Sequence, residues 1–258
     1  MGKFSGILIC SDFDGTLAEG GHVVGKNIDA IRYFQDNGGL FSVITGRSVE
    51  FLHARENEIV CNTYVGCVNG TVVYDYPNGK VVRTQYLEGD ILTPLMKIHR
   101  ELTVSKNIVV FHDDKDVVIH DSTDDFEEQL RNEFLSPVLK VIIRTTRPYT
   151  FAELDRIREI LGDKFEQARS WQTGLEIQNR GNNKGNAATV IARLAGAKRL
   201  ICVGDYENDL SLLSAADTSY AVQNAIDSLK QIADKVTVHV SDGAIAAIIR
   251  DIESELEK

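Results

Sequence analysis

The stretch Gly6–Thr16 constrains the fold of this chain more than any other. It opens with an apolar run, Ile7–Cys10, of the kind shown by a strand whose two faces are both buried. Asp12 and Asp14 follow at once, and Gly15-Thr16 then turns the chain. A buried strand that ends in acids places them at the carboxyl edge of a sheet, where open α/β folds bind ligands. Taken alone, the stretch also fits a strand followed by an ordinary Asp/Gly turn. The later segments decide between a functional site and a simple turn.

Apolar strand patterns alternate with helical patterns in both terminal regions of the chain. This alternation predicts a Rossmann-like parallel sheet with helices on both faces, because parallel strands need crossover connections. A polar loop is expected over 17–25, and Ser241-Asp242 can cap the last helix. We expect strands at 7–10, 40–44, 64–68, 200–203, 220–222 and 236–240, a hairpin at 71–74 and 80–84, and helices at 28–34, 48–58, 187–194, 210–213, 226–233 and from 241 onward.

The middle of the chain follows a different pattern. Helices are expected at 95–102, 124–134 and 151–161, and strands at 108–112, 117–120, 139–144, 165–169 and 174–178. Helices mixed with paired strands in this way indicate an α+β insert with a partly antiparallel sheet. We therefore expect a core domain whose first part is 1–86 and whose second part is 180–258, with an inserted domain at 87–179.

Composition and charge exclude several classes of protein. The net charge of −10 argues against nucleic acid or an anionic membrane as a partner. No apolar run approaches the roughly 20 residues that span a bilayer, and Met1 leads almost directly into the first strand, so we expect a cytoplasmic protein without a signal peptide. Cys10, Cys61, Cys67 and Cys202 show neither a CxxC pair nor a zinc spacing and are expected to be reduced thiols.

Several polar residues fall directly after buried strands or open the helix of the resumed alternation. They are Asp12, Asp14, Thr45, Asp205, Asn208, Asp209 and Lys184. Each has an ordinary alternative: Thr45 could be only a strand-end turn, Lys184 only a solvated helix start, and Asp205 and Asp209 helix N-terminal acids favoured by the helix dipole. Because parallel strands share one carboxyl edge, we expect these side chains to lie together.

Phosphoryl transfer through an aspartyl phosphate is the chemistry that needs such a set. An ionised carboxylate can attack phosphorus, but positive charge has to screen it from the anionic phosphoryl group. Mg²⁺ suits this role because it takes oxygen ligands. A second carboxylic acid can protonate the leaving oxygen, and a hydroxyl and a lysine can hold the phosphoryl oxygens.

Four segments resemble the motifs of the haloacid dehalogenase superfamily of aspartate-nucleophile phosphatases. In order, they are Asp12-Phe13-Asp14-Gly15-Thr16, Ile44-Thr45-Gly46-Arg47, Lys184-Gly185 and Gly204-Asp205-Tyr206-Glu207-Asn208-Asp209. The resemblance covers nearly the whole chain. The insert, with Asn69-Gly70 before it, is similar to the large α/β cap of the Cof-type subfamily. The resemblance implies Mg²⁺-dependent hydrolysis of a small phosphate monoester, such as a sugar phosphate.

The resemblance also implies a role for each motif residue. Asp12 would be the nucleophile and Asp14 the general acid and base. Magnesium would be held by Asp12, the backbone carbonyl of Asp14, and Asp205, with Asp209 supporting the metal or the lysine. The phosphate would be bound by Thr45, Gly46, Lys184 and Asn208.

Other functions fit the sequence less well. A receiver domain is much shorter, and a dinucleotide-binding protein needs a Gly-rich turn where Asp12 and Asp14 stand. A sugar-phosphate mutase or phosphotransferase using the same aspartyl phosphate stays open as the alternative, and a non-catalytic binding protein is disfavoured by the intact motifs. The sequence names neither the substrate nor the oligomeric state. Residues of the insert and its C-terminal boundary that could contact a substrate are His112, Arg144, Trp171 and Arg180.

Overall fold

The computed structural model describes residues 2–258 and divides into two compact units. The core unit comprises the residues up to Arg83 and those from Asn183 to Lys258, and the insert comprises Thr84–Asn182. The boundaries of the insert lie three residues outside the predicted range at each end. Each unit has its own sheets and its own hydrophobic core.

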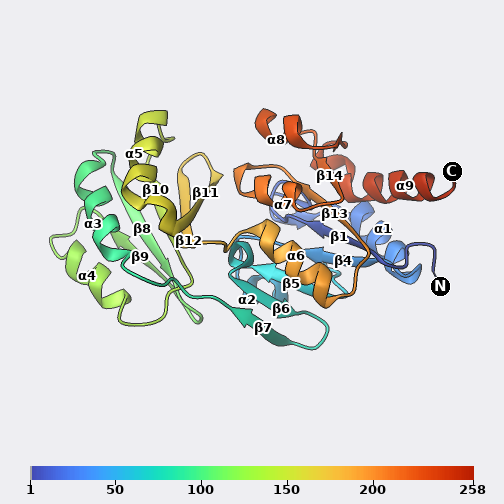
Figure 1. The fold of residues 1–258 in the computed structure, drawn as a ribbon, viewed down its shortest axis with the longest axis horizontal. Helices are drawn as coiled ribbons and strands as arrows, with labels where there is room; N and C mark the ends of the chain where they lie inside the picture. The colour runs from blue at the N-terminus through green and yellow to red at the C-terminus, as the bar shows by residue number, and fades with distance from the viewer. Residues whose placement is uncertain (1) are drawn as a thin grey trace. The chain divides into compact units, whose positions relative to one another are not determined.

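The core unit is built on a five-stranded sheet in which all neighbouring strands are parallel (Figure 1). Its strands, in spatial order, are β15 (Lys235–Val236), β14 (Thr218–Ala221), β13 (Arg199–Gly204), β1 (Ile7–Ser11) and β4 (Leu40–Val43). The chain moves from β1 to β4 on one side and later to β13 on the other. This reversal makes the end of β1 a topological switch point, where open α/β sheets bind ligands.

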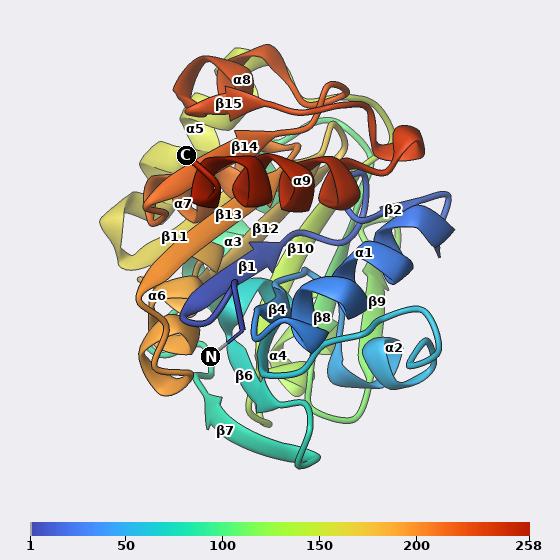
Figure 2. The same ribbon diagram turned by 90° about the vertical axis from the view of Figure 1, so that its right-hand side faces the viewer.

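Helices cover both faces of this sheet, as the alternating pattern predicts. Figure 2 shows α1 (Gly25–Asp36) and α9 (Ala244–Leu256) side by side on one face. On the other face α6 (Lys184–Leu194) and α7 (Leu210–Ser214) bury Ala187, Ile191 and Leu212 against Leu8 and Cys10 of β1. Two further helices of the unit are α2 (Val49–His53) and α8 (Asp227–Ile232).

Two smaller sheets complete the core unit. The strands β5 (Tyr64–Cys67), β6 (Val72–Asp75) and β7 (Lys80–Thr84) form a three-stranded sheet that includes the predicted hairpin. One parallel bridge, between Ile44 and Gly66, connects β5 to the chain just after β4. This bridge brings the residues after β5 close to the same edge of the parallel sheet.

Four local predictions were wrong. The strand expected at 236–240 ends at Val236, and Val240 lies in a 3₁₀ segment. The expected loop at 17–25 contains a hairpin of β2 (Ala18–Glu19) and β3 (His22–Val23), because Gly20 and Gly21 both adopt the positive φ of a tight hairpin turn. The helix expected over 48–58 ends at His53, since Leu52 is its one buried residue and no apolar stripe continues. Ser241 and Asp242 lie in a 3₁₀ turn rather than capping α9, because Gly243 (φ 86°) breaks the chain before Ala244.

The insert is a five-stranded antiparallel sheet whose strands, in spatial order, are β11 (Phe165–Trp171), β12 (Gly174–Asn179), β10 (Lys140–Thr145), β8 (Lys106–Phe111) and β9 (Asp116–His120). Three helices, α3 (Leu92–Glu101), α4 (Phe126–Glu133) and α5 (Phe151–Leu161), pack on one face of it. The shared core includes Leu95, Leu130 and Ile157 of the helices and Val110 and Ile143 of the strands.

Short 3₁₀ segments, η1 (Val68–Gly70), η2 (Gly162–Lys164), η3 (Glu207–Asp209) and η4 (Val240–Asp242), join some of these elements. All four cysteines carry free thiols. Among residues 2–258 no helix has the length and apolar character required to cross a bilayer.

Candidate active site

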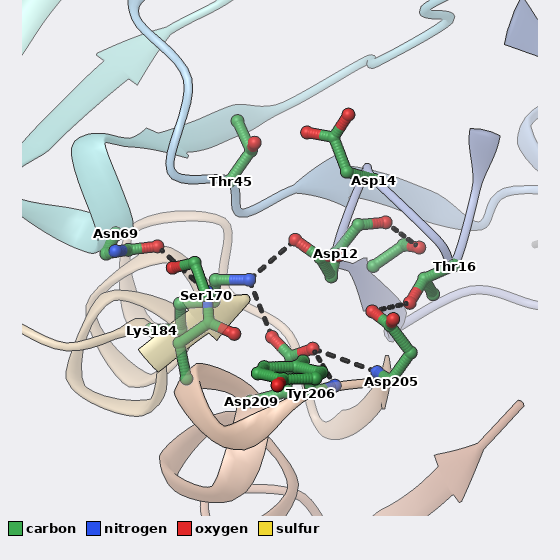
Figure 3. Close-up of polar contacts among 12 residues, drawn as sticks. Asp12, Asp14, Thr16, Thr45, Asn69, Ser170, Lys184, Asp205, Tyr206 and Asp209 are labelled. Atoms are coloured by element: carbon green, nitrogen blue, oxygen red, sulfur yellow. Dashed lines mark hydrogen bonds and ion pairs between the residues drawn. The ribbon is translucent and has the colours of Figure 1, made fainter. Parts of the chain in front are cut away.

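The ends of three neighbouring strands bring the predicted acids and hydroxyl to one edge of the core sheet. Ser11, the last residue of β1, is level with Val43 of β4 and Val203 of β13. The residues that follow these strands therefore emerge at the same height. Asp12 continues the ladder, its N–H donating to Val203 O at 3.0 Å. Figure 3 shows Asp12, Thr45, Asp205 and Lys184 gathered at this edge.

Lys184 lies between two carboxylates in the interior. Its Nζ is 2.5 Å from Asp12 Oδ1 and 2.6 Å from Asp209 Oδ1, and the lysine side chain is 1% exposed (Figure 3). Lys184 is the first residue of α6, after the N-cap Asn183. Helix α6 packs so closely here that a Cβ at Gly185 would lie 2.1 Å from Ser211 O. The glycine after the lysine is therefore required for the close packing that fixes the ammonium.

Asp209 connects the ammonium to the loop after β13. While Oδ1 accepts from Lys184, Oδ2 accepts the backbone N–H groups of Asp205 and Tyr206 at 2.9 and 3.2 Å. The Asp209 side chain is fully buried. A buried carboxylate with charged and backbone donors on both oxygens is held rigidly. Asp209 thereby sets the positions of both Lys184 and the loop that carries Asp205.

Asp205 faces the turn that follows Asp14. Thr16 Oγ1 donates to Asp205 Oδ1 at 3.1 Å. Gly15, with a φ of 85°, lies so close that a Cβ there would be 2.5 Å from Asp205 Oδ2. The glycine of the first motif thus leaves room for the Asp205 carboxylate, and the threonine beside it donates a hydrogen bond to that carboxylate.

Like charges and burial perturb the acids of this edge. Oxygens of Asp12, Asp205 and Asp209 all lie within 4.8 Å of one another. Burial, with the charges of Asp209 and Asp205 adding to it, raises the pKa of Asp12 well above its usual range. Burial and the Asp209 charge raise the pKa of Asp205 to about 7. Burial alone would lower the pKa of Lys184, but Asp12 and Asp209 outweigh it and raise that pKa.

These three carboxylates fit a divalent cation. One ammonium cannot balance three carboxylates, and burial together with the neighbouring carboxylate charges raises the pKa values of Asp12 and Asp205. Carboxylate oxygens gathered at one point are the donor set of hard cations such as Mg²⁺. The acidic triad is thus able to bind a metal ion.

Asp14 does not join the triad. Its carboxylate accepts two hydrogen bonds from Arg47, from Nε to Oδ2 at 2.9 Å and from Nη2 to Oδ1 at 3.0 Å. The backbone N–H of Gly15 beside it donates to Ala18 O. Sequence reasoning gave Arg47 no role. Its place two residues after Thr45, at the same sheet edge, was the available signal.

The other residues predicted to bind phosphate are linked by hydrogen bonds. Thr45 is fully buried; its Oγ1 accepts the Arg47 N–H at 3.2 Å, and its carbonyl accepts the Asn69 N–H at 2.8 Å. Asn208 Nδ2 donates to Asn69 Oδ1 at 3.4 Å. Gly46 lies between Thr45 and Arg47. Asn69, which the sequence linked only with the insert, thus lies among the predicted phosphate ligands.

The four insert residues suggested by the sequence have structural surroundings of their own. His112 is buried, with Nδ1 2.8 Å from Pro137 O and Nε2 3.0 Å from Glu133 Oε2. Trp171 Nε1 donates to Thr173 Oγ1, and the Arg144 guanidinium lies 5.8 Å from the Trp171 ring centroid. Arg180 is exposed. Both ring nitrogens of His112 thus have hydrogen-bond partners within the insert.

Comparison with known proteins identifies the family. A family model described as haloacid dehalogenase-like hydrolase matches residues 9–249. The 5-amino-6-(5-phospho-D-ribitylamino)uracil phosphatase YitU of Bacillus subtilis is 25% identical over 261 residues, covering 95% of this chain and 96% of YitU. The pyridoxal phosphate phosphatase YbhA of Escherichia coli is 26% identical over 281 residues, covering 96% and 98%.

Solved structures share the fold. The subclass IIB sugar phosphatase BT4131 superposes with a TM-score of 0.79 at 17% identity, over 95% of this chain and 98% of that one. A haloacid dehalogenase-like hydrolase from B. subtilis superposes with a TM-score of 0.78 at 19% identity, over 94% of this chain and 98% of that one. These likenesses confirm the predicted fold class of a parallel α/β core with an inserted domain. The chain belongs to the haloacid dehalogenase-like hydrolases, and its predicted identity as a phosphatase enzyme of that family is confirmed.

Proposed function

We propose that this protein hydrolyses a small phosphate monoester, with Mg²⁺ and through an aspartyl phosphate formed on Asp12. The observation that supports this most is the buried contact of Asp12 with Lys184 beside the Asp12–Asp205–Asp209 triad. A carboxylate held between an ammonium and a cation site suits attack on an anionic phosphoryl group, because the approaching charges are screened. When bound, Mg²⁺ would supply that screening and charge stabilisation in the transition state.

The first half-reaction transfers the phosphoryl group to the enzyme. An Asp12 oxygen forms a bond to phosphorus while the bond from phosphorus to the ester oxygen breaks. Asp14, as general acid, gives its proton to the departing oxygen, which leaves as an alcohol. The buried Lys184 ammonium, fixed by Asp209, stays close to the charge that develops on the phosphoryl oxygens.

The second half-reaction regenerates Asp12. Asp14, now a carboxylate, takes a proton from water, whose oxygen bonds to phosphorus as the acyl–phosphate bond breaks. Inorganic phosphate leaves and Asp14 is again protonated. If a sugar hydroxyl replaced the water, the same residues would give a mutase or phosphotransferase, which stays the alternative. Water as the acceptor agrees with the phosphatase names of the relatives.

The other polar residues are assigned to binding. We propose that Asp12, Asp205 and the backbone carbonyl of Asp14 hold the metal, and that Asp209 supports both the metal loop and the lysine. The phosphoryl oxygens would be bound by Thr45, Gly46, Lys184 and Asn208. The hydrogen bonds linking Thr45 to Asn69 and Asn69 to Asn208 support one contiguous phosphate site.

We further propose that the substrate is a sugar phosphate or a similar cytoplasmic metabolite, and that the inserted domain at 87–179 acts as a cap that selects it. YitU is named for 5-amino-6-(5-phospho-D-ribitylamino)uracil and YbhA for pyridoxal phosphate, both of them small phosphorylated compounds. With a net charge of −10, the protein needs local cations such as Lys184 to attract an anionic ester.

A phosphate-release screen tests the proposal. Purified protein is incubated with a panel of aryl, sugar and cofactor phosphate monoesters, with Mg²⁺ or with EDTA. We expect turnover only with Mg²⁺, and a loss of several orders of magnitude in Asp12→Asn with an unchanged fold. Full turnover in EDTA, or near-wild-type turnover in Asp12→Asn, would refute the proposed function.

A further inference from the structure

Arg47 and Asp14 form a two-point ion pair at the rim of the candidate active site. The guanidinium donates from Nε and Nη2 to the two carboxylate oxygens at 2.9 and 3.0 Å. The side chains are 51% and 46% exposed. Surface ion pairs contribute little to stability, typically about 0–1 kcal/mol. Stability alone therefore does not account for so well-formed a pair beside the triad.

An aromatic ring holds the guanidinium from the side. The Arg47 guanidinium carbon lies 4.7 Å from the centroid of the Phe51 ring, at cation–π distance. Phe51 meets Phe13 edge to face at 5.3 Å, and Phe13 is the fully buried residue between Asp12 and Asp14. The Arg47 guanidinium thus contacts Phe51, and Phe51 in turn contacts Phe13, the residue that directly precedes Asp14.

Backbone contacts fix the origin of the Arg47 side chain. The Arg47 N–H donates to Thr45 Oγ1 at 3.2 Å, and the Arg47 carbonyl accepts the Val68 N–H at 2.9 Å. Val68 has a φ of 52°, a left-handed conformation that is strained for a β-branched residue. Strain of this kind persists only where the surroundings impose it. The backbone of Arg47 is thus hydrogen-bonded on one side to Thr45 and on the other to the strained residue that follows β5.

We propose that Arg47 is the positioning residue of Asp14, an inference that rests on the proposed function of Asp14 as acid and base. A carboxyl group has about four lone-pair sites, so the two bonds from the planar guanidinium leave two, one of which can carry the proton that passes to the leaving oxygen and, once that proton is gone, accept one from water. A bidentate guanidinium also fixes the plane of the carboxylate, which a lysine ammonium cannot do. Without it, the half-exposed Asp14 side chain rotates freely and meets the leaving oxygen less often.

Steady-state kinetics on two kinds of substrate test this role. Alkyl phosphates need a proton on the leaving oxygen, whereas aryl phosphates with good leaving groups need it much less. We expect Arg47→Ala to lower kcat on an alkyl phosphate by roughly 10- to 100-fold, the cost of a misplaced catalytic group, and kcat on p-nitrophenyl phosphate much less. Arg47→Lys should recover little of the loss. Guanidinium ion added to Arg47→Ala should restore part of it, because the site is solvent-accessible.

Arg55→Ala is the matched control. The Arg55 guanidinium lies on the same Phe51 ring, at 4.0 Å from its centroid, and no hydrogen bond joins it to Asp14 among the contacts described for residues 2–258. We expect Arg55→Ala to leave the alkyl-to-aryl ratio unchanged. In an Asp14→Asn background, the Arg47 substitution should no longer change that ratio, because the group it positions has lost its acid function.

The outcomes separate the two proposals. If the wild type hydrolyses neither substrate, the proposed function fails. The positioning role is refuted if the wild type is active but Arg47→Ala lowers kcat on both substrates equally. It is also refuted if Arg47→Ala lowers the alkyl-to-aryl ratio of kcat as much in the Asp14→Asn background as in the wild type. A rise in alkyl turnover in Arg47→Ala would also refute it, because Arg47 would then restrain Asp14 rather than position it.

Discussion

The acidic triad predicts an unusual dependence of stability on pH and Mg²⁺. The pKa of Asp205 is raised to about 7 by burial and by the charge of Asp209, from an ordinary value of 3.8. Between these two values the folded protein keeps a proton that the unfolded chain has released. Stability therefore falls as pH rises through this interval, since it rises only where the unfolded state binds more protons.

The magnitude follows from the interval. At about 1.36 kcal/mol per pKa unit, Asp205 alone accounts for at most about 4 kcal/mol, of which about 2 kcal/mol is lost between pH 5.5 and 7.5. The pKa of Asp12 is shifted in the same direction and adds to the trend. Under the proposed function, Mg²⁺ would bind the deprotonated carboxylates and so replace the protons. The stabilisation by Mg²⁺ should therefore grow with pH across the range in which the metal-free protein loses stability.

Urea unfolding measures both effects. Free energies of unfolding are determined at pH 5.5, 6.5 and 7.5, each with EDTA or with MgCl₂ in excess. We expect the free energy of unfolding in EDTA to fall as pH rises, and the increase that Mg²⁺ causes in it to be largest at pH 7.5. In Asp205→Asn the free energy of unfolding should fall less with pH, and most of the stabilisation by Mg²⁺ should be lost. Equal Mg²⁺ increments at pH 5.5 and 7.5, or the same pH slope in Asp205→Asn, would refute the linkage.

Three further perturbations give separate tests. Gly15→Ala should weaken Mg²⁺ binding in a titration by calorimetry, because its Cβ would meet the Asp205 carboxylate; unchanged affinity would contradict this contact. Lys184→Met should destabilise the metal-free protein by about 3–5 kcal/mol in urea unfolding, since two buried carboxylates lose their counter-charge, and a loss below 1 kcal/mol would contradict it. A protein in which a Gly/Ser linker joins Thr84 to Gly181 should still hydrolyse an aryl phosphate but lose its preference among natural esters. Retention of the full-length ranking in kcat/KM assays would exclude the insert as the selector.

The sequence predicts an element most accurately where local and tertiary signals agree. Helix α5 matches the predicted range, Phe151–Leu161: Thr150 and Glu153 form a complete capping box at its start, and Gly162, with a φ of 60°, follows its last residue. The helix after Ser48 has an N-cap but only one buried residue, so its end depends on tertiary packing that no local pattern records. The insert was recognised from mixed patterns, whereas its antiparallel strand order comes only from the structure.

The site shows the same division. Asp12 and Asp205 directly follow buried strands, and Lys184 opens the helix at which the alternation resumes. These positions were enough to predict that the three side chains would meet, because parallel strands share one edge. The pairing of Asp14 with Arg47 was not predictable in this way, since it depends on side-chain torsions and on where α2 places Phe51. The left-handed Val68 runs against the preferences of its residue type, so no sequence rule would have found it.

Chemical trapping of the intermediate tests the central claim most directly. Borohydride reduces an acyl phosphate to an alcohol, so an aspartyl phosphate at position 12 is converted to homoserine, which mass spectrometry locates in the peptide. The Asp14→Asn variant is mixed with an aryl phosphate and Mg²⁺, quenched in acid and reduced; lacking the base for dephosphorylation, it should accumulate the intermediate. We predict homoserine at position 12, dependent on substrate and Mg²⁺. Homoserine at another aspartate would contradict Asp12 as the nucleophile. So would the absence of trapped product at position 12 in the Asp14→Asn variant when the wild type turns over the same substrate completely.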